Sequence, residues 1–305
     1  MKCTLRPAVL LFSAALGGCT VTVDSHTQIV REEKRFPVTG QADLRLTTFD
    51  GSIQIQSWDK PEIVVEVEKR GGTRDSVETL EVKSDQKGNS IELEVKRPRS
   101  ETFNGIGIYR TATARLIVMV PRATNIRARS GDGAITVEGI SGKIDVHTGD
   151  GSIRARDVIG DLTLSTGDGS VTVEDAEGRL DLNTGDGGVS VGGKLNAVRV
   201  HTGDGSVVYR AEPGTSMAEA WDITTGDGSV TVYLPREFSA ELDAYTGDGG
   251  IRNDLDDASL ERDDRTDSTT RRSEKTRRAF RGRIGQGGHE LRIRSGDGAI
   301  RLRVS

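Results

Sequence analysis

The chain has 305 residues, of which 34 % are apolar, 4 % aromatic and 29 % charged. Glycine contributes 38 of them, and counting glycine with the apolar set gives the ~45 % that is usual for a globular protein. The net charge of −5 and the few aromatic rings argue against nucleic-acid binding, which needs a basic surface and bases stacked on rings. The composition therefore excludes a disordered chain, a multi-span membrane protein and a nucleic-acid-binding protein.

The N-terminal segment predicts export. Lys2 and Arg6 precede an apolar run over residues 8–16, and two glycines and Cys19 follow it. A basic start, a short apolar run and small residues before a cleavage point are typical of a secretory signal peptide. The run is shorter than the ~20 residues that span a bilayer. Residues 1–18 are therefore the predicted signal peptide.

The sequence Leu16-Gly17-Gly18-Cys19 resembles the lipobox of bacterial lipoproteins. The resemblance implies cleavage before Cys19 and acylation (palmitate among the acyl groups) of its sulfur and amino group. Cys3 leaves with the signal peptide, so Cys19 would be a lone exported thiol without a disulfide partner, which lipidation explains. Several acyl chains anchor a protein stably where one does not. Cys19 is thus the predicted lipidation site and the lipid bilayer a predicted partner, and Thr20, where Asp favours inner-membrane retention, favours the outer membrane.

A short motif, Thr/Ser-Gly-Asp-Gly, recurs through the chain, with Phe49 in place of the first glycine in the first copy. Its aspartates are Asp50, Asp132, Asp150, Asp168, Asp186, Asp204, Asp227, Asp248 and Asp297. From Asp132 to Asp204 they are 18 residues apart, and the later steps are 23, 21 and 49. Apolar residues alternate with polar ones on both sides of each motif, which predicts a strand with one buried face on each side.

Two architectures fit this repeat. In a β-meander, Asp-Gly would be a two-residue hairpin turn between antiparallel strands. In a β-solenoid, the motif would be a corner, and each strand would pair with its copy 18 residues on at a rise of ~4.8 Å. Asp-Gly favours positive φ and tight turning in either case. The second glycine and the whole 18-residue unit favour an all-β, single-stranded β-helix-like solenoid over residues 128–305.

The flanking segments are less regular. Residues 19–38 are polar and are expected to be a tether. Residues 39–127 contain the first repeat and a strand pair around a polar turn at 84–89, and this irregular β region is expected to cap the open edge of the solenoid. Residues 254–283 are acidic up to Asp267 and basic from Arg271. Such a mixed-charge segment predicts a solvated insertion.

The repeated pattern of strand, Thr-Gly-Asp-Gly-Ser and strand resembles the bacterial adhesin-candidate or "toastrack" β-strand-repeat domains, a family of unknown function. Further matches are Pro121 at a strand end, Leu234-Pro235, and Gly285-Gln286-Gly287-Gly288, and the resemblance covers about residues 40–305. It implies a right-handed single-stranded β-helix or a close variant, exported or membrane-tethered members, and no established catalytic residues. Some members of the family are tied to envelope-stress signalling through fused or neighbouring partners.

Other motifs carry weaker signals. Residues 188–194 match the glycine and lysine spacing of a phosphate loop, but Leu195 stands where Ser or Thr should bind magnesium and no helical pattern follows. Calcium-binding solenoids carry an aspartate motif every nine residues, whereas here it recurs only once in 18. His147 and His201 occupy the same repeat position three coils apart, roughly 14 Å, too far to share a metal. No metal site and no cofactor are expected.

The sequence therefore predicts a non-catalytic protein. Serines recur two residues after the aspartates, and a place in every turn indicates a structural role, because a catalytic serine needs a base within hydrogen-bond reach. We expect a lipid-anchored envelope protein that acts as an adhesin-like interaction platform, with an unidentified envelope protein or glycan as partner. A periplasmic scaffold for stress signalling and a purely structural envelope component are the alternatives. The aspartates are expected to form a structural row along the turns, each accepting hydrogen bonds from its own turn.

Overall fold

The computed structural model describes residues 28–97, 112–255, 260–262 and 278–305. The predicted signal peptide, Cys3, Cys19 and His26 lie outside these residues. No helix in the described part of the chain is long and apolar enough to cross a membrane. The described residues form strands almost throughout, with one short helix, α1 (Arg74–Glu78), whose first turn is capped by Thr73.

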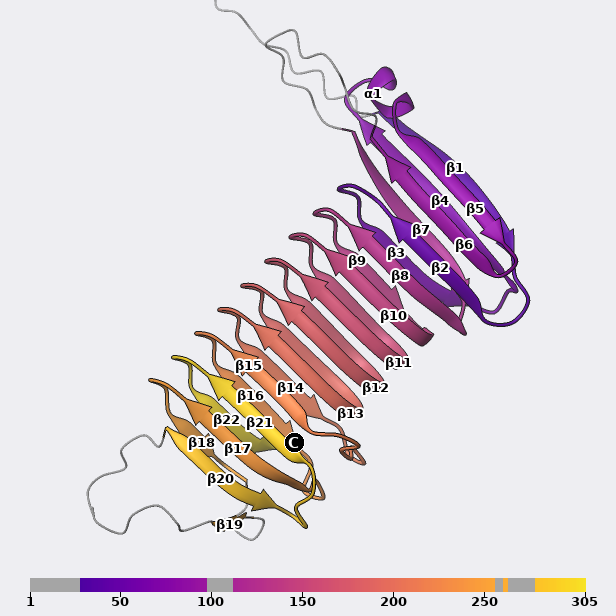
Figure 1. The fold of residues 1–305 in the computed structure, drawn as a ribbon. Helices are drawn as coiled ribbons and strands as arrows, with labels where there is room; N and C mark the ends of the chain where they lie inside the picture. Colours follow the sequence, from indigo (N-terminus) through magenta and orange to yellow (C-terminus); the bar gives the residue numbers. More distant parts are fainter. Residues whose placement is uncertain (1–27, 98–111, 256–259, 263–277) are drawn as a thin grey trace, which may run out of the picture.

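The strands stack side by side into one elongated body (Figure 1). The N-terminal strands are β1 (Gln28–Pro37), β2 (Ala42–Thr47), β3 (Ile53–Trp58), β4 (Glu62–Gly71), β5 (Glu81–Lys87), β6 (Ser90–Lys96) and β7 (Thr113–Pro121). The central strands are β8 (Thr124–Ser130), β9 (Ile135–Glu138), β10 (Ser141–Thr148), β11 (Ile153–Thr166), β12 (Val171–Thr184), β13 (Val189–Thr202), β14 (Val207–Ala211), β15 (Trp221–Thr225) and β16 (Val230–Leu234). The last are β17 (Ala240–Thr246), β18 (Ile251–Asn253), β19 (Leu260–Arg262), β20 (Ala279–Ile284), β21 (Glu290–Ser295) and β22 (Ile300–Val304).

The pairing confirms the solenoid and excludes the meander. β11 and β12 pair in parallel with Leu162 opposite Leu180, which is a step of 18 residues. The same step relates β10 to β11. Each coil thus places one strand before an aspartate turn and one after it, and β11, β12 and β13 each run through both halves. The strands before the turns form the pre-turn wall, and those after the turns form the post-turn wall.

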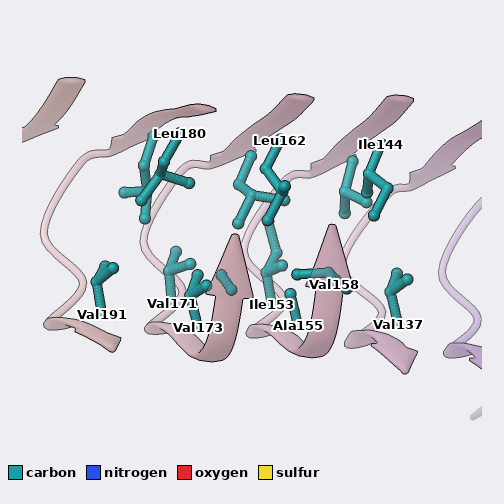
Figure 2. Packing of buried hydrophobic residues seen from close by; sticks show 14 of the residues in the cluster. Val137, Ile144, Ile153, Ala155, Val158, Leu162, Val171, Val173, Leu180 and Val191 are labelled. Carbon is teal, nitrogen blue, oxygen red and sulfur yellow. The ribbon is translucent and has the colours of Figure 1, made fainter. Parts of the chain in front are cut away.

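The core lies between the two walls. Leu162 and Leu180 point inward from the pre-turn wall toward Val171 and Val173 of the post-turn wall (Figure 2). These side chains are at most 1 % exposed. Inward residues alternate with outward ones on both sides of each turn, as the period-two pattern predicts, and the alternation is interrupted where β11, β12 and β13 pass from one wall to the other. Stacking like residues over like therefore builds one continuous apolar column along the body.

The coil order differs from the chain order near both ends. β2 and β3 lie between the β8/β9 coil and strands β6 and β7. β21 and β22 lie between the β15/β16 coil and the β17/β18 coil. The turn of Asp297 is therefore inserted between those of Asp227 and Asp248. This insertion accounts for the 49-residue step between the last two motif copies.

Antiparallel strands finish both ends. β5 and β6 form the hairpin expected around residues 84–89, with Glu81 opposite Lys96, so that prediction is confirmed.

Three expected boundaries are corrected. The tether of residues 19–38 overlaps β1, which pairs with β4 over residues 28–37. The array begins with β8 at Thr124 and not at residue 128, and β2 and β3 also stack in it. The insertion of residues 254–283 contains β20, which pairs with β17.

Candidate functional site: the turn edge and the outward faces

Every aspartate turn except the first is bonded to the turn stacked before it through a buried hydroxyl, whereas the hydroxyl of Thr48 in the first turn has no hydrogen-bond partner among the described residues. Thr166 Oγ1 lies 3.1 Å from the carbonyl oxygen of Gly149 and 2.9 Å from that of Gly151, to which it donates. The same Oγ1 accepts from the N–H of Gly169 at 3.3 Å. Equivalent bonds from the threonine hydroxyl to two carbonyls are made by Thr148, Thr184, Thr202, Thr225 and Thr246. The first residue of the motif is therefore a cross-link between coils.

The motif glycines serve close stacking, and the expected positive φ is wrong for them. None of the motif glycines is among the described residues with positive φ. Instead, a Cβ added at Gly169 would lie 2.0 Å from the carbonyl oxygen of Gly151 in the preceding coil. At Gly167 it would lie 2.7 Å from the carbonyl oxygen of Gly149. Turns that stack this closely leave no room for any side chain at either position.

The aspartates form an exposed row along this edge. Asp132, Asp150, Asp168, Asp186 and Asp204 are all exposed. Their side chains make none of the hydrogen bonds or ion pairs found among the described residues, so the expected bonds from backbone N–H groups of their own turns are absent there. Asp50 pairs with Arg97 at 3.2 Å, and Asp248 with Arg278 at 3.2 Å. The described residues contain no group of three or more His, Cys, Asp or Glu side chains placed to hold a metal.

The remaining sequence candidates are dispersed. His147 and His201 are exposed on the pre-turn wall, in β10 and β13. The phosphate-loop match at 188–194 falls largely within β13, so no helix N-terminus follows it. The serines two residues after the aspartates, such as Ser170 and Ser206, lie exposed beside the turn edge. No histidine is hydrogen-bonded to any of them in the described part of the chain.

Outward side chains on the pre-turn wall form ion pairs across neighbouring strands. Arg127 and Asp145 are register partners and lie 2.9 Å apart, and Asp181 and Arg199 lie 3.3 Å apart. The same arrangement is found in three further pairs: Arg45 with Glu92, Arg292 with Asp222, and Arg281 with Asp243. Cross-strand pairs of opposite charge stabilise a sheet modestly and keep neighbouring charges compensated.

Asp243 is the least exposed carboxylate of these pairs. Burial raises its pKa, but hydrogen bonds from Arg294 and Arg281 oppose this, and its pKa is held below the usual range. On the post-turn wall Arg156 and Glu174 form a similar pair, and the Glu174 carboxylate raises the pKa of Arg156. Charge on both walls is therefore mostly arranged as local, self-neutralising pairs.

A hollow of about 380 Å³ lies on the pre-turn wall near the N-terminal end. Its polar lining includes Asp43, Arg45, Glu92, Asn125, Arg127 and Asp145. Asn125 is held within it, because its amide donates to Asp43 at 2.9 Å and its oxygen accepts from Gln41 at 3.1 Å. The polar side chains that line the hollow thus mostly form hydrogen bonds and ion pairs with one another, and they carry both positive and negative charge.

Sequence reasoning missed a second grouping, at the far end of the post-turn wall. Arg252 and Arg301 are register partners on β18 and β22, although 49 residues separate them. Both stand four residues after a motif aspartate, so the repeat alignment contains the signal. Their contact depends on the out-of-order coil, which the repeat alignment does not reveal.

The chain belongs to the Toastrack DUF4097 family, whose model matches residues 41–303. Among solved structures, an adhesin candidate from Bacteroides fragilis is 11 % identical, with 90 % of this chain and 97 % of that chain covered and a TM-score of 0.41. A cell-adhesion candidate from Clostridium sporogenes is 15 % identical over 91 % and 100 %, with a TM-score of 0.31. A lipid-binding candidate from Parabacteroides distasonis is 12 % identical over 89 % and 96 %, with a TM-score of 0.46. Comparison with curated proteins gave no match.

Proposed function

We propose that this protein is a lipid-anchored, non-catalytic component of the cell envelope whose two walls serve as an adhesin-like interaction platform. The observation that carries the proposal is the regular arrangement of outward side chains on the two walls. Stacked coils present outward side chains in straight rows, about 4.8 Å from one strand to the next, along the whole body. Such a surface suits extended or repeating ligands, because contacts with equivalent rows can add up. The partner class is an envelope protein or glycan.

The anchor part of the proposal rests on Cys19. Acylation there would place the start of β1, at Gln28, nine residues from the anchored cysteine. The position of Thr20 favours the outer membrane. Cys19→Ala is expected to abolish incorporation of labelled palmitate and to release the protein from membranes or leave it with an uncut signal. Cys3→Ala is the matched control, because it removes the other cysteine from within the signal peptide. Palmitate labelling that survives Cys19→Ala would contradict the anchor.

Cross-linking in intact cells tests the platform. Photo-reactive residues would replace Thr163 on the pre-turn wall and Thr172 on the post-turn wall, two outward positions in the regular array, and inward Leu182 would serve as the control. We expect a recurrent partner to cross-link to at least one wall and not to the buried position. A membrane signalling protein as sole partner would favour the stress-signalling scaffold instead. Absence of any partner from both walls would favour a purely structural component.

A further inference from the structure

Strands β14, β16, β22 and β18 lie toward the end of the body opposite β1 (Figure 1), and together they carry four arginines and one outward-facing tyrosine on the post-turn wall. We call them the basic patch: Arg210 on β14, Tyr233 on β16, Arg301 and Arg303 on β22, and Arg252 on β18. Arg210, Tyr233 and Arg301 each lie between two buried residues and so point outward. Arg252 and Arg303 are exposed. Strands β14, β16, β22 and β18 are consecutive in this wall.

Two features set the spacing of the charges. Arg252 and Arg301 are directly opposite each other, so about 4.8 Å separates their backbones. Tyr233 is the register partner of both Arg210 and Arg303. The guanidinium carbons of these two arginines lie 4.9 and 6.0 Å from the centre of its ring. Cation–π contacts of this kind hold guanidinium groups in defined places at the surface.

The basic patch lacks most of the cross-strand ion pairs that outward arginines form elsewhere on the two walls. Elsewhere an outward arginine commonly faces a carboxylate on the next strand, as Arg199 faces Asp181. Arg45 and Arg127 on the pre-turn wall also face each other, but they pair with Glu92 and Asp145 respectively. Arg252 faces Arg301, and neither forms an ion pair with a described residue. Among the described residues, Arg303 forms one ion pair, in which its Nε lies 3.8 Å from Oδ2 of Asp254. Like charges directly opposite each other destabilise a sheet. No described carboxylate engages either guanidinium group, so both are available to an external anion.

The shape of the patch indicates which kind of anion. Guanidinium groups bind carboxylate, phosphate and sulfate oxygens in a planar fork. The patch is part of an open wall and none of its residues lines the hollow of about 380 Å³, so each contact is exposed and individually weak. Useful affinity then requires several contacts on one ligand. The net charge of the chain is −5, so attraction for a polyanion must come from local groups of basic residues such as this patch.

We propose that the basic patch binds an extended anionic glycan, whose carboxylate or phosphate groups contact Arg252, Arg301, Arg303 and Arg210 in succession. Tyr233 acts as the spacer that positions two of these arginines. The proposal names the ligand chemistry of one part of the platform and rests on the function proposed above. It also predicts that the glycan raises the melting temperature, because it removes the repulsion between Arg252 and Arg301.

The test uses the full chain in detergent and surfaces coated with polygalacturonate, phosphorylated mannan or neutral dextran. We expect binding to at least one of the two polyanions at about 50 mM salt, loss of binding at about 500 mM, and no binding to dextran. Galacturonate monomer should not compete at millimolar concentration. Arg252→Gln with Arg301→Gln should weaken binding about tenfold.

The control variant carries Arg127→Gln and Arg199→Gln, which remove the same charge from paired positions on the other wall. It should bind within about twofold of the unaltered chain, with both variants first shown to melt cooperatively. Equal weakening by both variants, or no binding to either polyanion, would overturn the proposal. If a partner cross-links to a wall in cells but no glycan binds, the proposed platform function is supported and the glycan proposal is contradicted. If a glycan binds but no cellular partner is found, the basic patch is supported as a glycan site and the platform function is not.

Discussion

At the residue scale, the motif is explained by the distance between stacked turns. Gly187 and Gly188 are adjacent and neither has positive φ, yet their surroundings differ. A Cβ at Gly187 would lie 2.0 Å from the carbonyl oxygen of Gly169, whereas at Gly188 the nearest atom would be 3.9 Å away. Other coils carry serine at the position of Gly188, as at Ser170. Only the first of the two glycines is therefore demanded by the structure.

We expect Gly187→Ala to lower the free energy of unfolding by about 3 kcal/mol, because the backbone of the neighbouring coil cannot move away without breaking its own stacking. Gly188→Ala should be neutral or slightly stabilising, since alanine restricts the unfolded chain. Chemical denaturation of both variants checks this. Equal losses of stability for the two would show that the glycines act through backbone freedom and not through close approach.

At the element scale, stability comes from rows of inward residues that run across strands. Leu182 on β12 is fully buried, with Leu164 and Val200 as its register partners on either side. His201 on β13 belongs to an outward row and is exposed. A charge in an inward row would be surrounded by apolar neighbours with no partner, whereas an outward side chain can be shortened without loss of packing.

Leu182→Asp is accordingly expected to cost several kcal/mol, and His201→Ala no more than about 0.5 kcal/mol. Thermal melting of both variants, followed by circular dichroism, gives the comparison. A similar fall in melting temperature for the two would refute the assignment of inward and outward rows.

At the scale of the whole molecule, the aspartate turns form one edge of the body. In spatial order the last three are those of Asp227, Asp297 and Asp248. Neighbouring charges ~4.8 Å apart repel by roughly 0.9 kcal/mol in water. Solvent and salt screen this repulsion at an exposed edge. We propose that the row is structural and that calcium is at most a millimolar ligand.

With a dissociation constant near 1 mM, ~1 mM calcium would stabilise the fold by only about 0.4 kcal/mol per site. Even when this is summed over the gaps between neighbouring aspartates, melting temperatures measured with excess chelator and with ~1 mM calcium, at constant ionic strength, should therefore differ by less than about 10 °C. A rise of more than about 10 °C would identify the edge as a metal site. Magnesium at the same concentration separates a specific effect from charge screening.

The sequence by itself determined the repeating unit. Alternation around Asp168 predicts which residues of β11 and β12 face inward, and the 18-residue spacing predicts their register. These features are local or strictly periodic, so they can be read from one stretch of chain and carried to the next. The hairpin of β5 and β6 was predictable for the same reason, since its strands and turn are contiguous.

Only the tertiary structure decided which coil stacks on which. Every parallel coil offers the same row of backbone N–H and C=O groups, so any strand with a matching pattern of inward residues can pair with it. The order of strands along the chain therefore does not dictate that β22 lies between β16 and β18. That choice brings Arg252 opposite Arg301. The stacking distance, and with it the reason for the motif glycines, likewise arises between coils. Pairing of edges is a long-range event, and composition and periodicity do not encode its order.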